Sequence, residues 1–162
     1  MTIEPAELKR RMNRLEAGLR RSGVKLTHQR LEIFREVAKS LDHPDVETIF
    51  SGVRRRVSTV SLDTVYRTLW LLMDLGLLTT LGSPRERVRF DANMSSHHHF
   101  ICGKCGMTRD FFSHKFDRLK IPNAVKALGS VESTKIEVRG ICFRCSKKNK
   151  QKHRVSRKKE KK

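Results

Sequence analysis

The sequence has 162 residues, 37% hydrophobic and 33% charged, which suits a soluble protein of one ordinary domain or two small ones. Its longest apolar stretch, around residues 69–81, is interrupted by Asp74 and Gly76, and the N-terminus lacks a signal-peptide core, so we expect no membrane span and a cytoplasmic location. The net charge is +19, of which the last 16 residues carry +9, so the other 146 residues are basic as well. No amphipathic helix with a large apolar face accompanies this charge, which therefore indicates nucleic acid rather than a membrane surface as the partner.

Apolar residues at helical spacing predict four helices in the first half of the chain, over residues 5–22, 27–40, 45–56 and 61–76. Thr27, Asp45 and Ser61 begin three of them and are residue types that cap helix N-termini. Gly23 and Gly76 suit the C-terminal ends of the first and the last helix. The first half of the chain is therefore predicted to be helical.

A basic hairpin is predicted directly after the fourth helix. Two short strand-like runs, residues 77–81 and 88–91, flank a turn rich in Gly, Ser, Pro and Arg, and Arg85, Arg87 and Arg89 lie at its tip. Three helices followed by such a hairpin is the order of a winged helix-turn-helix, whose last helix enters the DNA major groove and whose wing touches phosphates. The alternative is a helical bundle with a hairpin attached, and the basic tip and the net charge favour DNA binding.

The second half of the chain predicts a small α/β domain. Residues 97–102 and 107–112 read as paired strands, a helix is expected near residues 116–128, and residues 131–142 contain a further strand. A domain of about 50 residues needs a zinc ion, a dimer partner or both, since its core alone is too small. The predicted fold class is α+β. The predicted domains are a winged-helix DNA-binding domain with an extra N-terminal helix (1–91), a hinge (92–96), a metal-binding dimerisation domain (97–146) and a disordered basic tail (147–162).

The cysteines predict a structural zinc site. All four fall in two CxxC pairs, Cys102 with Cys105 and Cys142 with Cys145. Two such pairs supply the four thiolates of a closed tetrahedral site, for which Zn²⁺ is favoured. The alternatives are a redox dithiol or four unligated thiols, and both are less typical of a cytosolic chain with this spacing.

Three consecutive histidines stand just before the first cysteine pair. On a strand, alternate residues share a face, so His97 and His99 point to one side and His98 to the other, where we expect it to be exposed. An HxH pair can chelate a metal ion, but alone it is weak support for a site. Further ligands would have to converge on it.

These motifs together resemble the ferric uptake regulator family of metal-dependent transcription repressors. The resemblance is carried by HP at 43–44, TVYRTL at 64–69, RFD at 89–91, HxHxxCxxC at 97–105 and the later CxxC, and it covers about residues 26–145. It implies a homodimer that binds a double-stranded DNA operator. It also implies a regulatory metal site that takes ligands from both domains, here His43, Asp91, His97, His99 and Asp110.

The ligand types bear on which metal binds. Three imidazoles and two carboxylates with no thiolate suit Fe²⁺ or Mn²⁺. Within the family, members resembling the peroxide regulator carry aspartate at the two acid positions, as Asp91 and Asp110 do here, whereas iron-uptake regulators tend to carry glutamate. The resemblance then implies that peroxide, with iron bound, oxidises His43 or His97 and so releases DNA. A third metal site of some members would map to Ser96, His98, Asp117 and Thr134, and we expect it to be absent or weak because only two are good ligands.

Candidate DNA contacts lie mainly at the start of the fourth predicted helix. A tyrosine ring can pack on a thymine methyl group and an arginine can contact a guanine edge or a phosphate. Trp70, further along the helix, is expected in the core or at a dimer face. The candidate contacts are Lys25, Arg30, Ser61, Thr64, Tyr66 and Arg67.

The preferred interpretation is a dimeric, metal-dependent, peroxide-sensing repressor that is not an enzyme. The first alternative is an iron, manganese, zinc or nickel uptake regulator of the same family. A metallohydrolase is disfavoured, because the sequence has no HExxH or comparable motif. A zinc-ribbon RNA-binding module is disfavoured as well, since the aromatic residues stand beside the cysteine pairs, where core or dimer contacts are expected. Metal-dependent binding to duplex DNA would separate the first interpretation from the last two.

Overall fold

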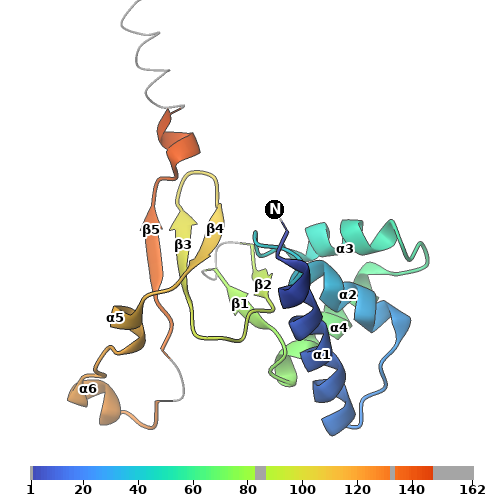
Figure 1. The fold of residues 1–162 in the computed structure, drawn as a ribbon, viewed down its shortest axis with the longest axis horizontal. Helices are drawn as coiled ribbons and strands as arrows, with labels where there is room; N and C mark the ends of the chain where they lie inside the picture. The colour runs from blue at the N-terminus through green and yellow to red at the C-terminus, as the bar shows by residue number, and fades with distance from the viewer. Residues whose placement is uncertain (1, 83–86, 132–133, 148–162) are drawn as a thin grey trace, which may run out of the picture. The chain divides into compact units, whose positions relative to one another are not determined.

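The computed structural model describes residues 2–82, 87–131 and 134–147, and the chain divides into two compact units between Ser95 and Ser96. The fold class is α+β, as predicted, with helices and a short hairpin in the first unit and a small sheet in the second (Figure 1). Within the described ranges, no helix is both long enough and apolar enough to cross a bilayer.

The first unit contains four helices, α1 (Pro5–Arg21), α2 (His28–Ala38), α3 (Val46–Arg54) and α4 (Leu62–Asp74). The side chains of Thr27, Asp45 and Ser61 each accept a hydrogen bond from the backbone N–H three residues further on, which confirms the three predicted caps. Gly76 follows α4 with a φ of 64°, a left-handed conformation that glycine adopts without strain. Local sequence signals therefore determine where these helices begin and end.

The helices of the first unit enclose one apolar core. Its members come from every helix and from the hairpin, and α1 joins it through Leu15 and Leu19, both at most 1% exposed. Burial of each such side chain stabilises the fold by about 1.5–3 kcal/mol before its conformational entropy is subtracted. The α1 helix also donates a hydrogen bond from Arg14 to the carbonyl of Ala92, so the extra N-terminal helix is an integral part of this unit.

The predicted hairpin forms β1 (Thr79–Leu81) and β2 (Arg89–Asp91), which pair antiparallel as the wing of a winged helix. The sequence predicts that the arginines of this hairpin contact DNA phosphates. Of these, Arg85 lies outside the described residues. Arg87 instead pairs with carboxylates at the start of α3, and Arg89 donates to two backbone carbonyls in the loop before it. In this structure both arginines thus tie the wing to the rest of the unit.

The second unit is a three-stranded sheet in the order β4-β3-β5. β3 (His98–Cys102) pairs antiparallel with β4 (Thr108–Phe111), as predicted, and parallel with β5 (Glu137–Gly140). The prediction of one helix over residues 116–128 is wrong, because two four-residue helices, α5 (His114–Asp117) and α6 (Asn123–Lys126), replace it. Pro122 stands between them and favours a helix start rather than a helix interior.

The buried apolar cluster of this unit is small. It consists of Cys102, Cys142 and Cys145, with Phe100 and Met107 packed against them. Three of its five members are therefore thiols, so the core of this unit is also the candidate metal site. A unit of this size and composition needs a further cross-link to be stable.

Candidate metal centres and DNA interface

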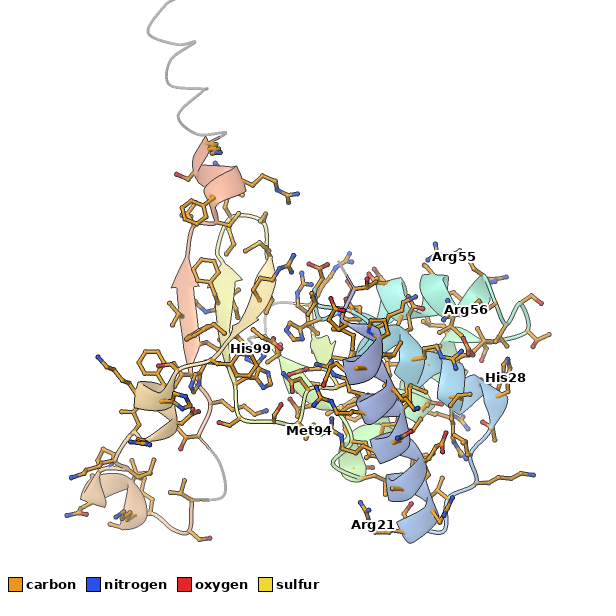
Figure 2. All side chains as sticks on the ribbon, viewed as in Figure 1. Arg21, His28, Arg55, Arg56, Met94 and His99 are labelled. Carbon is orange, nitrogen blue, oxygen red and sulfur yellow. The ribbon has the colours of Figure 1, made fainter. Side chains whose placement is uncertain are left out.

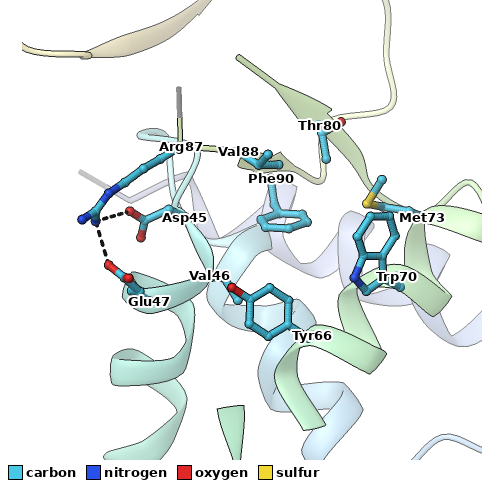
Figure 3. A pocket seen from close by; sticks show the side chains of 10 residues that line it. All are labelled: Asp45, Val46, Glu47, Tyr66, Trp70, Met73, Thr80, Arg87, Val88 and Phe90. Carbon is cyan, nitrogen blue, oxygen red and sulfur yellow. Dashed lines mark hydrogen bonds and ion pairs between the residues drawn. The ribbon is translucent and has the colours of Figure 1, made fainter. Parts of the chain in front are cut away.

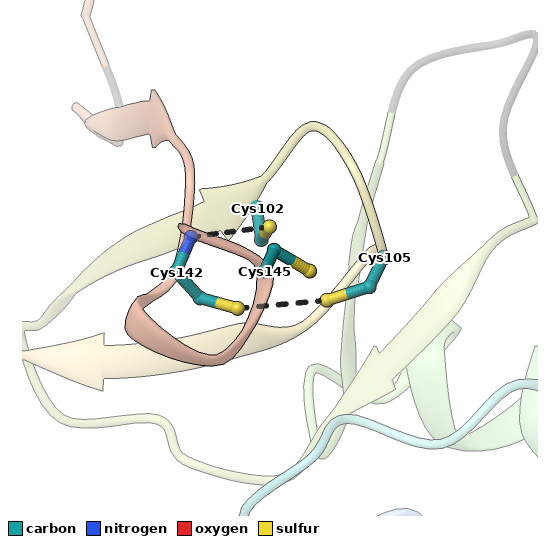
Figure 4. Close-up of side chains that lie close together, drawn as sticks. All are labelled: Cys102, Cys105, Cys142 and Cys145. Carbon is teal, nitrogen blue, oxygen red and sulfur yellow. Dashed lines mark hydrogen bonds between the residues drawn. The ribbon is translucent and has the colours of Figure 1, made fainter. Parts of the chain in front are cut away.

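The four cysteines converge at one end of the sheet, and their sulfur atoms all lie within 4.8 Å of one another (Figure 4). Cys102 ends β3, Cys105 follows in the turn to β4, and the second pair comes after β5, the strand that runs parallel to β3. The Cys105 and Cys142 sulfurs are 3.8 Å apart, close to the separation of two sulfurs bound to one tetrahedral zinc ion. The ligand set fits Zn²⁺ and leaves no position for a substrate.

The backbone around these thiols favours the thiolate form of the first pair. The Cys142 N–H points at the Cys102 sulfur from 3.3 Å, and this hydrogen bond lowers the pKa of Cys102 to about 6. A hydrogen bond from the Met107 N–H likewise lowers the pKa of Cys105. The pKa of Cys145 is raised to about 12, first by its hydrogen bond with Cys105 and then by burial. Four thiolates in this space therefore require a cation among them.

Two of the predicted regulatory ligands meet inside the first unit. His43 and Asp91 are 3% and 2% exposed, and His43 Nδ1 lies 3.6 Å from Asp91 Oδ1. Asp91 ends β2, and the same carboxylate oxygen accepts a hydrogen bond of 2.7 Å from the Asn93 N–H. A buried imidazole and a buried carboxylate so arranged can offer one nitrogen and one oxygen to a metal ion.

The backbone holds His43 in an uncommon conformation. Its φ is 47°, in the left-handed region that few residues other than glycine adopt. Arg89 donates to the His43 carbonyl at 3.2 Å, and the Phe90 N–H donates to the Pro44 carbonyl at 3.0 Å. The loop that carries His43 is therefore fastened to β2, the strand that ends in Asp91, so the two side chains are positioned together.

The other three predicted ligands meet inside the second unit. His99 on β3 is the direct cross-strand partner of Asp110 on β4, and His99 Nε2 lies 3.5 Å from Asp110 Oδ1 (His99 is labelled in Figure 2). The Nε2 atoms of His97 and His99 are 2.9 Å apart, and His97 Nε2 lies 3.9 Å from Asp110 Oδ1. The alternation predicted from the sequence is thus present, and the cross-strand register adds the carboxylate to the HxH pair.

His98 faces the other side of β3, as predicted, but the prediction that it is exposed is wrong. It is 3% exposed and packs against the rings of Phe111 and Phe116, whose centroids lie 5.4 and 5.3 Å from its own and 6.1 Å from each other. Its Nε2 is 3.4 Å from Asp117 Oδ1, which in turn accepts a hydrogen bond from Ser96. Among the described residues neither ring nitrogen of His98 has a hydrogen-bond partner. Three of the four positions of the third family site therefore converge, while Thr134 is exposed.

The candidate DNA contacts of α4 lie at its exposed N-terminal end. Ser61 caps the helix and also bonds the Thr64 hydroxyl at 2.8 Å. Tyr66 is 43% exposed, and the Arg67 side chain is 81% exposed and pairs with Asp63 at 2.9 Å. Surface ion pairs of this kind contribute little stability, so Arg67 can exchange its partner for a phosphate or a base edge at small cost.

A polar groove of about 290 Å³ separates the start of α2 from α4. Arg30 and Arg67 line it from the two helices, and Lys25 stands exposed in the segment before α2. Two arginines and three threonines against the single carboxylate of Asp63 suit an anion such as a DNA phosphate. The groove is lined by Thr27, Gln29, Arg30, Asp63, Thr64, Arg67, Thr68 and Leu71.

For Trp70, which also lies on α4, the sequence predicts a place in the core or at a dimer face, and the first of these alternatives is wrong. It is 61% exposed and so does not belong to the core. A second groove, of about 520 Å³, lies between α4 and the wing, and Trp70 lines it together with Tyr66 (Figure 3). The sequence does indicate this exposed position, because Trp70 stands four residues after Tyr66 and helical spacing places both residues on the same face.

A winged helix followed by a small sheet with a tetracysteine cluster and clustered His/Asp ligands defines a metal-binding regulatory protein. The model of the ferric uptake regulator family matches residues 21–139, and the chain therefore belongs to this family. Its members are metal-responsive transcriptional regulators rather than enzymes, and this confirms the resemblance found in the sequence motifs.

Individual relatives show which branches the chain resembles. It is 29% identical over 145 residues to the peroxide-responsive repressor PerR of Staphylococcus epidermidis, covering 90% of this chain and 97% of PerR. Among solved structures, a zinc-bound manganese uptake regulator is 28% identical with a TM-score of 0.63, covering 80% of this chain and 98% of that one. The ferric uptake regulator of Helicobacter pylori has a TM-score of 0.69 at 23% identity, covering 90% and 97%, and supports the fold alone.

Proposed function

We propose that this protein is a homodimeric, metal-dependent repressor that binds operator DNA through α4 and the wing and releases it when peroxide oxidises a histidine. Family membership supports the regulatory role, and the exposed, arginine-bearing face of α4 supports DNA as the target. The proposed DNA contacts are those predicted from the sequence, Lys25, Arg30, Ser61, Thr64, Tyr66 and Arg67.

The observation that carries the metal proposal is the convergence of His97, His99 and Asp110 in one unit and of His43 with Asp91 in the other. These donors are imidazole nitrogens and carboxylate oxygens, which suit Fe²⁺ or Mn²⁺ better than the thiolates of the cysteine site do. Two imidazole nitrogens 2.9 Å apart beside a carboxylate already have the spacing of ligands to one ion. All five side chains would hold the regulatory metal.

Because the five ligands come from both units, one ion that binds all of them would fix the angle between the units. If only that angle places both recognition helices of a dimer in successive major grooves, metal affinity and DNA affinity are coupled reciprocally. Removal of one ligand need not empty the site to end repression. It need only remove the few kcal/mol that favour the DNA-binding arrangement.

The cysteine site and the exposed apolar residues beside it have a structural role in this proposal. Zn²⁺ bound by the four cysteines would hold β3 and the segment after β5 together. Ile141, between the end of β5 and Cys142, is 56% exposed, and Phe143, between the two cysteines of the second pair, is 89% exposed. Apolar side chains so exposed next to a sheet edge support this face as the homodimer contact.

The peroxide response rests on His43 and His97, the two ligands proposed to be oxidised. Fe²⁺ held by the five ligands would catalyse the oxidation of an imidazole by peroxide, whereas Mn²⁺ would do so far more slowly. One oxygen atom of the peroxide is inserted into an imidazole C–H bond and the other leaves as water. An oxidised ring is a poorer nitrogen donor, so the ligand set loses its preference for the DNA-binding arrangement.

The test compares the Fe²⁺-loaded and Mn²⁺-loaded proteins, prepared without oxygen. A duplex is first selected by the Mn²⁺ form from a random-sequence pool, and its binding is measured before and after a small dose of peroxide. We expect binding to fall only in the iron form, with a mass increase of one oxygen on the peptide of His43 or His97. The peptide that contains exposed His28 is the internal control and should stay unmodified. Binding that survives in the iron form, with no histidine adduct, would rule out peroxide sensing.

The second candidate is a regulator that responds to the level of iron, manganese, zinc or nickel only. It is favoured by the likeness to the manganese uptake regulator, which is about as high in identity as the likeness to PerR. Under this alternative, peroxide has no effect on the iron form. DNA binding then follows the concentration of one free metal ion, which titrations with each metal in turn would identify.

A further inference from the structure

The exposed face of α4 carries two aromatic rings one helical turn apart. Tyr66 and Trp70 are 43% and 61% exposed, and Arg67, whose side chain is 81% exposed, lines the groove on the other side of the helix. Large aromatic rings that are exposed together on one helix indicate a contact surface. Tyr66 is already among the proposed DNA contacts, and Trp70 is not.

The groove next to these rings has an apolar floor and a charged end (Figure 3). Met73 of α4, Val88 of the wing and the ring of Phe90 line it beside the two aromatic side chains. At one end Arg87 bridges Asp45 and Glu47, at 3.2 and 2.7 Å, which fixes the wing to the start of α3. The walls of the groove are therefore held in place without a ligand.

Grooves of opposite character flank α4. On one side Arg30 and Arg67 line the polar groove, which suits a phosphate. On the other side Trp70, Tyr66 and Val88 line the apolar groove, and the acidic pair at its end makes a phosphate unfavourable there. An occupant that meets both grooves at once must be anionic along one edge and apolar at a defined point.

Duplex DNA has this combination in its major groove. The phosphate backbone supplies the anionic edge, and the 5-methyl group of thymine is the apolar group that a base pair presents there. We propose that Trp70 is a specificity-determining residue that packs on a thymine methyl group of the operator, one helical turn beyond Tyr66. This inference rests on the proposed DNA-binding function of α4 and extends it to a residue and a base.

The test removes one methyl group at a time from the DNA. A duplex is selected from random sequences by the Mn²⁺-loaded protein, and each thymine is then replaced in turn by uracil, which differs only in lacking the methyl group. Affinities are measured for the native chain and for Trp70→Ala, Trp70→Phe and the control Leu128→Ala, which removes an 88% exposed apolar side chain in the second unit.

We expect one thymine per half-site at which uracil weakens binding of the native chain about fourfold, the effect of one buried methyl group. At that position uracil should leave the affinity of Trp70→Ala unchanged, whereas Trp70→Phe retains part of the discrimination and Leu128→Ala retains all of it. Trp70 is the single tryptophan of the sequence, so its fluorescence should also change when the duplex is added.

Two results would overturn the inference. The first is that uracil weakens binding of the native chain and of Trp70→Ala to the same extent at every position, and the second is that the duplex binds with no change in tryptophan fluorescence. If Trp70→Ala binds more weakly but responds to uracil as the native chain does, this counts as the first result. Trp70 would then contact the sugar-phosphate backbone instead of a thymine methyl group. Failure to select any duplex with the metal-loaded native chain would be a different outcome, since it contradicts the proposed function itself.

Discussion

Arg56 donates from Nε to Oε2 of Glu32 at 2.5 Å, and so ties the turn between α3 and α4 to the middle of α2. A second hydrogen bond of 2.7 Å joins its Nη2 to Glu36, one helical turn further along α2. The two glutamate side chains are 4% and 8% exposed, whereas Arg56 is 36% exposed. This group, the α2–Arg56 clamp, sets the geometry of the helix-turn-helix from which α4 projects.

Replacement of Arg56 by methionine should destabilise the first unit by about 3 kcal/mol. The variant leaves two carboxylates buried without their shared partner, and removing one side of a buried ion pair typically has an effect of about 3–5 kcal/mol. The expected value lies at the lower end because Arg56 is partly exposed, and because Glu32 keeps its ion pair with Arg35 and Glu36 keeps its ion pair with Lys39. Urea denaturation followed by circular dichroism measures the difference in the free energy of unfolding.

Arg55→Met is the matched control, because Arg55 is the neighbouring residue and is exposed (both are labelled in Figure 2). It removes the same charge and should change the free energy of unfolding by less than about 0.5 kcal/mol. Equal destabilisation by the two variants would mean that net charge matters here and that the clamp does not.

The clamp should also make stability depend on pH in the acid range. Burial alone would raise the pKa of Glu32, but the hydrogen bond from Arg56 and the charges of Arg35 and Arg56 outweigh it, so this pKa lies below the ordinary 4.5. A carboxylate with a lowered pKa in the folded state contributes stability that is complete above its unfolded pKa. That stability is lost as the pH falls through the folded value.

The native chain should therefore lose its advantage over Arg56→Met as the pH is lowered from about 6 to below 4.5, the ordinary pKa of glutamate. Denaturation curves of both proteins across this range, with the difference plotted against pH, provide the measurement. A difference that stays constant down to pH 3 would show that Glu32 does not keep its charge through this interaction.

Local signals made most of the fold predictable. Apolar periodicity located the four helices, and the caps Thr27, Asp45 and Ser61 act through hydrogen bonds to residues three positions away. Strand alternation likewise separated His97 and His99 from His98. Such features depend on a few neighbouring residues, and so they can be read without knowledge of the tertiary structure.

What could not be predicted depends on residues distant in sequence. Glu32 and Glu36 look like solvated helix positions until Arg56, 24 and 20 residues away, is seen to pair with them. The need for glycine at position 52 also depends on a distant residue, since a Cβ there would lie 2.3 Å from the Glu36 carboxylate. His98 is buried by Phe116, which α5 brings back to β3. Sequence periodicity assigns charged and polar residues to the surface, and only knowledge of the tertiary contacts can correct that assignment.

Loss of one cysteine ligand should unfold the second unit and leave the first folded. A serine in place of Cys102 does not ionise, so the site would keep only three thiolates in a unit whose small core consists largely of these residues. We expect about one zinc ion per native chain after dialysis against a chelator and close to none for Cys102→Ser.

Lys104→Ala is the control, because Lys104 is exposed in the same turn and is not a ligand. Zinc is measured by atomic absorption, and amide NMR spectra report the folding of each unit. Dispersed signals from β3 to β5 in a zinc-free Cys102→Ser protein would contradict a structural role for the metal.

The proposed regulatory site should lose Mn²⁺ affinity when His99 is replaced by alanine. His99 contacts both His97 and Asp110, at 2.9 and 3.5 Å, so its removal takes away a nitrogen donor and the neighbour that orders the other two groups. The loss should exceed the roughly 10–100-fold that follows removal of a residue that only orients a ligand. Titration calorimetry with Mn²⁺ measures it, and His28→Ala, which removes an exposed histidine at the start of α2, is the control. Because the proposed function couples metal affinity to DNA affinity, His99→Ala should weaken duplex binding in Mn²⁺ and leave the residual binding of the metal-free protein unchanged. If His99→Ala weakened duplex binding equally with and without Mn²⁺, the substitution would act through folding. His99 would then not be a ligand of the regulatory metal.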